Sequence, residues 1–367
     1  MNNPVAHIIG GFQIYGSCLD SRPYGSGHIN DTFVAGFSQA GTRVRYIFQR
    51  INHRVFKNPP DLMENIQRVT GEARRQLKKA GVPDVSRRSL RVIPARDGKA
   101  FCRDEEGSYW RCYPFIEGAR TYDIIQNPRQ AYEAARAFGE FQKLVAGLAG
   151  PRLHETIPNF HNTRSRLERL KEVAAADPQE RLASVTSEWE FICERERVVD
   201  VLLNLQAEGR IPERVTHNDT KLNNVMIDDA TETGICVLDL DTVMPGLALY
   251  DFGDMVRTAT SPAAEDETDL SKLRMQMPMF KALVRGYLST AGSFLNDVEK
   301  THLAFSGKLI ALEIGIRFLT DHLEGDVYFK TRRPSHNLDR CRTQLALVKS
   351  IEEQEEEMNA FVREVAQ

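Results

Sequence analysis

Hydrophobic positions follow a period of two in the first third of the chain and a helical period in most of the remainder. Alternation at residues 31–35 and 44–49 predicts two strands of a hairpin, and further strands are expected near residues 90–93 and 109–113. One helix is expected in this region, over residues 58–80, because two prolines stand at its start and its apolar positions repeat every three or four residues. That stripe consists of Leu62, Ile66, Val69, Ala73 and Leu77.

The pattern changes after a short segment, residues 114–118, that we interpret as the connection between two lobes. Helices are predicted beyond it at residues 130–148, 163–176, 187–208, 270–289, 297–323 and 338–365. This change predicts an α+β fold with a small β-rich N-terminal lobe, residues 1–115, and a large, mainly helical C-terminal lobe, residues 116–367.

One polar segment of the helical lobe carries the residue types that phosphoryl transfer requires. Asp219 is followed by Asn224 and, fifteen residues after that, by Asp239. Residues 225–227 and 235–238 predict a buried hairpin, whose open end would place Asn224 beside Asp239. Two oxygen ligands can hold Mg²⁺ there, while the Asp219 carboxylate orients an acceptor hydroxyl. The segment therefore predicts phosphoryl transfer from a Mg-nucleotide.

Four neighbours of these residues have expected roles. Lys221 could neutralise the phosphoryl group during transfer, and His217 is expected to pack beneath the loop rather than to act on substrate. Asp241 is either a further metal ligand or a residue that orients one. The triplet beginning at Asp251 (Asp-Phe-Gly) binds metal in protein kinases. The hairpin already places Asp239 where a metal ligand is needed, so we expect Asp251 to support the loop or to cap the next helix.

A glycine-containing turn at residues 24–30 precedes the first strand of the predicted N-terminal hairpin. Glycines let backbone amides approach phosphates, although a plain β-turn explains the same pattern. Kinases usually place a phosphate-binding lysine on the next strand, whereas this chain has Gln49 and Arg50. Either Arg50 substitutes for the lysine, or the metal and the glycine-containing turn suffice. We expect the adenine near the connection between the lobes. The candidate nucleotide-binding residues are thus Gly25, Ser26, Gly27, His28, Asn30, Arg50, Pro114, Phe115 and Ile116. With the Mg²⁺ site, they predict a protein-kinase-like two-lobed fold.

Composition narrows the partners and the location. A formal net charge of -3 provides no overall attraction to nucleic acid or to an anionic membrane. The 6 cysteines are scattered without metal-ligand spacing, which favours reduced thiols. Neither a signal peptide nor a long apolar run is visible. We therefore expect a cytoplasmic protein with a small-molecule substrate and no obligate protein partner.

Two late segments offer acceptor contacts. Arg317 supplies hydrogen-bond donors and Tyr328 a flat face with a hydroxyl, which together suit a polar sugar. By pattern alone, the two residues could equally be a structural ion pair and a core aromatic.

The chain resembles the aminoglycoside phosphotransferase-like kinases and, within them, the N-acetylhexosamine 1-kinases. The motifs that carry the resemblance are YGSGHIN, FQRIN, WRCYPFIEG, RAFGEFQ, IPNFHNT, RVTHNDTKLNNVMID, DLDTVMPG, YDFGDMVR, IRFLTDHLEGDVYF and HNLDRCRTQL. They extend over most of the chain, and the long THNDTKLNN…DLDTVMPG signature and GDVYF are the specific ones.

The resemblance implies ATP- and Mg²⁺-dependent phosphorylation of the anomeric hydroxyl of N-acetylglucosamine or N-acetylgalactosamine. It makes Asp219 the catalytic carboxylate, Asn224 and Asp239 the metal ligands, and Arg317 and Tyr328 sugar contacts. It also makes Gln49, in place of the usual lysine, a feature of this subgroup.

Other functions stay open at this stage. A kinase of the same fold could act on another small alcohol, such as an aminoglycoside, choline or homoserine. A protein kinase is disfavoured because Thr-His-Asn-Asp replaces His-Arg-Asp. A non-catalytic nucleotide-binding regulatory protein would have no need for Asp219, Asn224 and Asp239 together.

Overall fold

The computed structural model describes residues 5–25 and 29–366. Contacts divide the chain into two compact units. Unit 1 comprises residues 1–121, 144–158 and 226–245, and unit 2 comprises residues 122–143, 159–225 and 246–367. Each unit thus joins segments that are distant in sequence, and the division of the chain into lobes at residue 115 stays a prediction.

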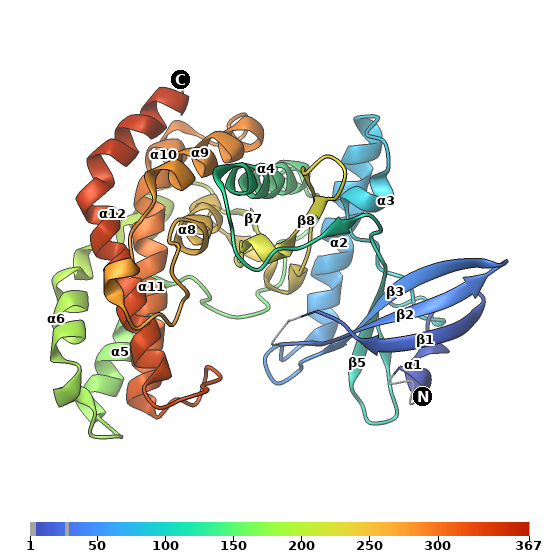
Figure 1. Ribbon diagram of the computed structural model, residues 1–367, viewed down its shortest axis with the longest axis horizontal. Helices are drawn as coiled ribbons and strands as arrows, with labels where there is room; N and C mark the ends of the chain where they lie inside the picture. Colours follow the sequence, from blue (N-terminus) through green and yellow to red (C-terminus); the bar gives the residue numbers. More distant parts are fainter. Residues whose placement is uncertain (1–4, 26–28, 367) are drawn as a thin grey trace. The chain divides into compact units, whose positions relative to one another are not determined.

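Unit 1 is built on a five-stranded sheet with the order β1-β2-β3-β5-β4 (Figure 1). The strands are β1 Ser17–Pro23, β2 Asp31–Gln39, β3 Thr42–Ile51, β4 Cys102–Arg103 and β5 Tyr109–Pro114. All four pairings are antiparallel. The predicted hairpin is confirmed, because β2 pairs with β3 from Asp31↔Arg50 to Gln39↔Thr42. Ala40 and Gly41 form its two-residue turn with positive φ, which matches the twist of the strands.

Aromatic side chains fill the core of this sheet. Phe12 meets Phe48 edge-to-face at 5.7 Å between ring centroids, and Phe37 stacks on Phe48 at 6.4 Å. The short helix α1, Ala6–Ile9, adds Ile8 to the same cluster. Burial of these rings holds the strands in register, because a slip of one residue would turn them to the solvent.

Two helices and a second sheet complete unit 1. Helix α2, Pro59–Lys79, buries the whole predicted apolar stripe, and α3 spans Val85–Arg88. The strand predicted at residues 90–93 was wrong: this segment is irregular and makes one ladder bond, from Ile93 N to Cys112 O. Pro94 follows it and has no N–H to continue the pairing. The second sheet consists of β6 Ala119–Arg120, β8 Val225–Asp228 and β9 Gly234–Val237, so the predicted β8–β9 hairpin is confirmed.

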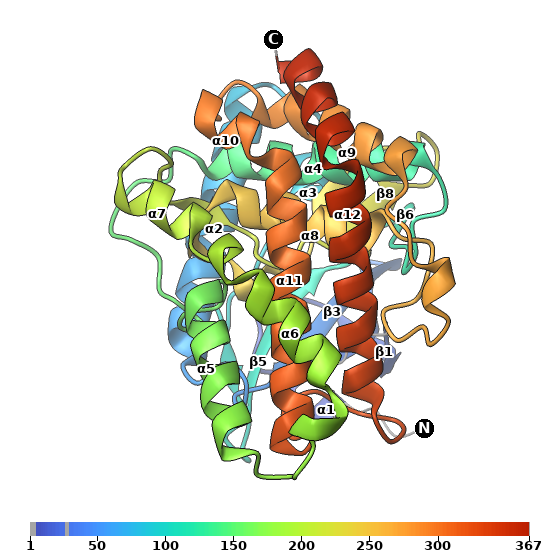
Figure 2. The same cartoon turned by 90° about the vertical axis from the view of Figure 1, so that its left-hand side faces the viewer.

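Unit 2 is helical. Its elements are α4 Pro128–Val145, α5 Thr163–Ala176, α6 Thr186–Glu194, α7 Val201–Ala207, α8 Ala248–Ala259, α9 Met277–Ala291, α10 Asp297–Thr301, α11 Leu303–Glu324, α12 His336–Ala366 and the short strand β7 Arg214–Thr216. A further short strand, β10, spans Met244–Gly246. Figure 2 shows α11 beside α12, and α11 is buried on nearly every side, which explains its apolar sequence. Within the described residues, no helix is both long enough and apolar enough to cross a membrane.

Three of the predicted helices were wrong in extent. The helix expected over residues 187–208 is divided into α6 and α7. Near this division the Arg195 guanidinium donates a hydrogen bond to the Phe191 carbonyl, and the backbone N–H of Arg195 donates to Ile192 O instead. The helix expected from residue 270 begins at Met277, with Pro278 in its first turn. The helix expected over residues 297–323 is interrupted at His302, whose ring nitrogen Nδ1 donates to Val298 O at 2.7 Å.

Gly253 of α8 provides a test of how tightly unit 2 is packed. A Cβ at this position would lie 2.4 Å from Ser306 O on α11. Gly253→Ala should therefore force the two helices apart and lower the free energy of unfolding by about 1–3 kcal/mol. Chemical denaturation measures the change. The matched control is Gly71→Ala in α2, where a Cβ meets nothing within 4 Å and should stabilise by about 0.5–1 kcal/mol. Equal midpoints for the two variants would contradict this account of the packing.

Candidate active site

The loop after β7 is held by a buried carboxylate. Asp251 of α8 has an exposed fraction of 0%, and its oxygens accept the backbone N–H of His217 at 2.9 Å and of Asn218 at 2.6 Å. Gln142 Nε2 donates to the same carboxylate at 2.6 Å. Asn218 adopts a φ of 65°, which is uncommon outside glycine and is fixed here by these bonds. The prediction that Asp251 supports the loop is confirmed, although the residue lies inside α8 rather than at its cap.

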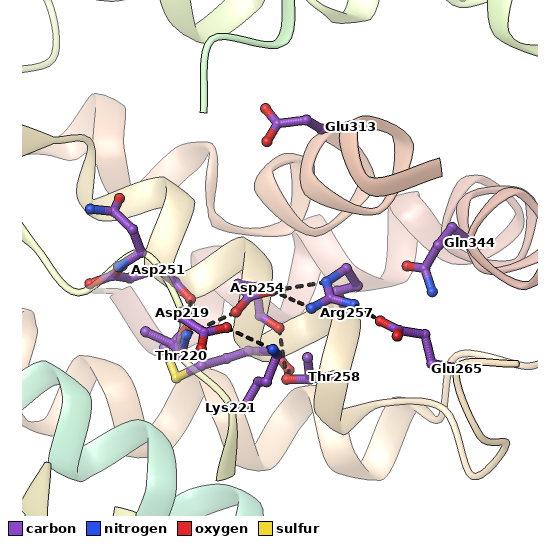
Figure 3. Close-up of polar contacts among 12 residues, drawn as sticks. Asp219, Thr220, Lys221, Asp251, Asp254, Arg257, Thr258, Glu265, Glu313 and Gln344 are labelled. Carbon is purple, nitrogen blue, oxygen red and sulfur yellow. Dashed lines mark hydrogen bonds and ion pairs between the residues drawn. The ribbon is translucent and has the colours of Figure 1, made fainter. Parts of the chain in front are cut away.

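A second carboxylate of α8 holds the next residue of the loop. Asp254 accepts the backbone N–H of Thr220 at 2.8 Å, and Thr220 Oγ1 donates to Asp251 O at 2.6 Å. Arg257 pairs with Asp254 at 2.8 Å, and Glu265 pairs with Arg257 at 3.0 Å (Figure 3). The sequence between the predicted catalytic residues is therefore immobilised through its backbone, so that its side chains are presented from a rigid base.

Asp219 and Lys221 form an ion pair on this loop, with 2.9 Å between Lys221 Nζ and Asp219 Oδ1 (Figure 3). Burial alone would raise the pKa of Asp219, but the Lys221 ammonium, with His217 and Arg257 nearby, holds that pKa below its ordinary value. Asp219 in turn raises the pKa of Lys221 against the effect of burial. The carboxylate is thus ionised and half-exposed, as a group that orients a substrate hydroxyl must be.

Asn224 faces the same carboxylate. It ends the 3-10 turn Leu222–Asn224, and its Nδ2 donates to Asp219 O at 2.8 Å and to Asp219 Oδ2 at 3.3 Å. Because both partners are acceptors, the nitrogen of the amide is identified and its oxygen points elsewhere. Within the described residues Asn224 Oδ1 makes no hydrogen bond, which leaves that oxygen suited to a cation.

His217 lies beneath the loop, as predicted. Its exposed fraction is 0%, and its Nδ1 accepts the backbone N–H of Asp219 at 3.3 Å. Phe138 and Phe141 of α4 contact the ring edge-to-face. The histidine therefore fixes the backbone of Asp219 and is itself fully buried.

In unit 1, the turn after β9 is held in a similar way. Asp239 has a φ of 52°, and Asp241, two residues later, pairs with the buried Arg111. Asn30 Nδ2 donates to the other oxygen of Asp241 at 2.5 Å, and Thr156 Oγ1 donates to its carbonyl at 2.9 Å. Both carboxylate oxygens of Asp241 are engaged, which favours an orienting role over a metal-ligand role. Asn224 and Asp239 belong to different units, so their pairing on one cation stays a prediction.

The predicted nucleotide-binding residues have contacts within unit 1. Asn30 also accepts the backbone N–H of Asn52 at 3.0 Å, and Arg50 pairs with Asp31. The guanidinium carbon of Arg45 lies 3.7 Å from the ring centroid of Phe115. Pro114, the residue before Phe115, ends β5, and Ile116, the residue after it, is buried. Gly25 has a φ of 82°, which requires glycine. Ser26, Gly27 and His28 lie outside the described residues. Phosphate binding by any of these residues stays a prediction.

The two predicted acceptor contacts lie together in unit 2. The Arg317 guanidinium carbon is 6.0 Å from the ring centroid of Tyr328, 5.6 Å from that of Phe329 and 5.3 Å from that of Phe160. Among the described residues no carboxylate lies within ion-pairing distance of Arg317, so the structural ion pair left open above is wrong. Tyr328 is 62% exposed, so it is not a core aromatic. Asp321 fixes its loop by accepting the backbone N–H groups of residues 327, 328 and 329.

Sequence reasoning missed several residues of these clusters. Arg111 is buried in β5, donates from Nε to Gln49 Oε1 at 2.9 Å and pairs with Asp241. His161 and Glu313 pair in unit 2 at 2.8 Å. A charged residue within an apolar strand or helix was the available signal, because such a residue is buried only with a partner.

The ion pair on the loop predicts a pH effect. Lys221→Met should raise the pKa of Asp219, because burial would no longer be offset by the adjacent ammonium. Because the pKa of Asp219 is lower in the folded protein than its ordinary value of 3.8, the ionised carboxylate stabilises the folded state at pH values above 3.8. This stabilisation is lost as the pH falls through the pKa that Asp219 has in the folded protein. In the variant, the acid limb of kcat/KM should therefore move to higher pH, and an NMR titration of the carboxyl should shift in the same direction. Lys272→Met, at a surface pair with Glu267, is the control. An unmoved acid limb would contradict the assignment.

Comparison with known proteins places this geometry in a family. A model described as the phosphotransferase enzyme family matches residues 20–278. An aminoglycoside phosphotransferase structure from Alicyclobacillus acidocaldarius is similar over 92% of each chain, with a TM-score of 0.58 and 12% identity. A choline kinase from Cryptosporidium parvum is similar over 95% of this chain and 93% of its own, with a TM-score of 0.54 and 14% identity. A spectinomycin phosphotransferase crystallised with ADP and spectinomycin covers 92% and 94%, with a TM-score of 0.53 and 13% identity.

These structural likenesses confirm the predicted α+β, protein-kinase-like fold. The family match covers more than half of the 367 residues and includes the loop of Asp219 and the β8–β9 hairpin. The chain therefore belongs to the phosphotransferase enzyme family.

Proposed function

We propose that this phosphotransferase transfers the γ-phosphoryl group of ATP to the anomeric hydroxyl of an N-acetylhexosamine, which gives the sugar 1-phosphate and ADP. The observation that carries the proposal is the presence in one unit of two clusters. One is the ionised Asp219 on its immobilised loop, and the other is Arg317, which has no carboxylate within ion-pairing distance among the described residues, beside the exposed Tyr328. The first supplies the chemistry of transfer to a hydroxyl, and the second supplies an acceptor site.

Asp219 acts by position. An ionised carboxylate accepts a hydrogen bond from the sugar hydroxyl, aims its oxygen at the phosphoryl group and takes the proton as the new O–P bond forms. A low pKa does not oppose this role, because most of the bond-breaking at phosphorus precedes proton loss in a loose transition state. Lys221 keeps the carboxylate ionised and can neutralise the phosphoryl oxygens.

A bound Mg²⁺ would supply positive charge to neutralise the phosphate oxygens of the nucleotide. Asn224 and Asp239 are the residues that would hold it, and the donor set fits a hard cation because both offer oxygen. The Asn224 amide is oriented for this by the bonds of its nitrogen to Asp219. Gly25 and the segment Pro114–Ile116 remain our candidates for contact with the nucleotide.

The charges around Arg317 favour a neutral acceptor. The pKa of Arg166 is lowered mainly by burial and, to a smaller extent, by repulsion from the nearby Arg317 guanidinium. Two guanidinium groups repel a polycation such as an aminoglycoside, and the aromatic faces that could bind choline already contact Arg317. An acetamido carbonyl and sugar hydroxyls can accept hydrogen bonds from Arg317. Homoserine lacks the sugar ring whose apolar C–H face would pack on Tyr328.

The proposal includes a cytoplasmic location and no obligate protein partner. The cysteines of the chain are free thiols, which suits a reducing compartment. A regulatory protein without catalysis would have no use for an oriented Asn224 beside an ionised Asp219.

Asp219→Asn tests the chemistry. The variant should keep its fold and its affinity for ADP and should lose turnover by roughly three orders of magnitude or more, because a neutral amide neither orients nor accepts from the hydroxyl in the same way. Wild-type protein is assayed with ATP and Mg²⁺ against N-acetylglucosamine, N-acetylgalactosamine, kanamycin, choline and homoserine, and NMR locates the phosphate. Phosphate on O6, or transfer to non-sugar acceptors alone, would overturn the 1-kinase assignment.

Arg317→Met tests the acceptor site separately. Loss of a charged hydrogen-bond donor is worth about 1.5–3 kcal/mol, so the acceptor KM should rise roughly 10- to 150-fold while the KM for ATP stays within about twofold. Steady-state kinetics with both substrates varied measures the two constants. Arg169→Met, at an exposed ion pair with Glu324, is the matched control. A rise in the ATP KM of equal size would remove Arg317 from the acceptor site.

A further inference from the structure

His161 lies between two hydrogen-bond acceptors in unit 2. Its Nδ1 is 2.8 Å from Glu313 Oε1, and its Nε2 is 3.2 Å from the backbone carbonyl oxygen of Asn218. The exposed fraction of the histidine is 7% and that of Glu313 is 0%, so both side chains are buried. Phe160 and Tyr250 cover the ring, with 4.7 Å and 5.1 Å between centroids.

The two acceptors determine the protonation state of the ring. A backbone carbonyl accepts only, and an ionised carboxylate accepts only. Burial opposes ionisation of Glu313, but His161, the Thr163 hydroxyl at 2.6 Å and Arg317 together hold its pKa below the ordinary value. An acceptor thus faces each ring nitrogen, a geometry that suits a ring donating from both nitrogens, since a neutral imidazole would turn a lone pair towards one of the oxygens.

The ring connects the two parts of the proposed active site. Glu313 precedes Arg317 by four residues on α11, so both side chains lie on one side of that helix. Asn218 immediately precedes Asp219 on the catalytic loop. One imidazole thus spans from the helix that carries the acceptor contact to the backbone next to the catalytic carboxylate.

We propose that His161 is a positioning residue which, as an imidazolium held between Glu313 and Asn218, sets the place of Asp219 relative to the acceptor bound at Arg317. This inference rests on the proposed function for the identity of the acceptor, but not for the state of the ring. The bond to Asn218 connects this loop to α11 through His161 and Glu313, whereas Asp251 and Asp254 tie the loop to α8.

The first experiment needs no substrate. In protein with ¹⁵N-labelled histidine rings, both nitrogens of His161 should carry protons at pH 7, with the signals assigned by their loss in His161→Gln. The isosteric Glu313→Gln variant should release the proton from the ring. A wild-type ring with one unprotonated nitrogen would overturn the proposal, whatever the acceptor of the enzyme is.

The second experiment measures kinetics with whichever acceptor the wild-type protein phosphorylates. His161→Gln and Glu313→Gln should each lower kcat roughly 10- to 100-fold, because a displacement of about 1 Å at the reacting groups has effects of this size. The ADP dissociation constant should stay within about twofold. Thr163→Val removes the other donor to Glu313 but keeps the pair of His161 and Glu313, so it should lower kcat less than either of these variants while lowering stability.

Three kinetic results would contradict the positioning role: unchanged kcat in both the His161 and Glu313 variants, an equal loss in Thr163→Val, or a parallel loss of ADP affinity. If His161→Gln does not fold, Glu313→Gln and the wild-type ring spectrum decide the question. If the N-acetylhexosamine assignment is wrong, the acceptor assay will show it, and the experiments on His161 can still be carried out and interpreted with the acceptor that is found.

Discussion

The active site depends on the buried carboxylate of Asp251. A carboxylate with no exposed surface is unfavourable unless donors surround it, and burial raises its pKa accordingly. Here the donors are the backbone N–H groups of His217 and Asn218, with Gln142. These bonds hold Asn218 at positive φ and thereby turn the next residue, Asp219, outward. Loss of the carboxylate would remove this acceptor from two buried N–H groups and would weaken the support of the backbone next to Asp219.

Unit 1 uses the same principle with different groups. Asp241 is surrounded by Arg111 and Asn30, while Thr156 and Asn65 hold carbonyls of the same turn. The turn holds Asp239 at positive φ, as the catalytic loop holds Asn218. Backbone strain at these two positions is sustained by buried polar networks, and each network stays intact only while every member has a partner. In each unit, a side chain that we predict to be functional is thus positioned by buried polar groups.

The sequence was most informative where the interaction is local. The stripe of α2 and the hairpin of β2 and β3 follow from spacing alone, and the supporting role of Asp251 followed from the hairpin spacing that assigned the metal to Asp239. The errors lie where a distant or competing contact decides. Pro94 stops a strand at residues 90–93, and the Arg195 side chain divides a helix. The pairs Arg111–Asp241 and His161–Glu313 join residues 130 and 152 positions apart, which no periodicity encodes.

The Asp-Phe-Gly triplet shows why a motif has to be interpreted with its surroundings. Gly253 is required because α8 and α11 pack too closely for a side chain, and Phe252 is buried against Phe280 and Tyr287. Each residue of the triplet therefore has a packing or supporting task within unit 2. The same three letters that place a metal in protein kinases here support the loop that carries Asp219. The loop of Asp219 is held by α8, whereas the loop of Tyr328 is held by Asp321, so a change at the proposed acceptor contacts need not disturb the support of Asp219.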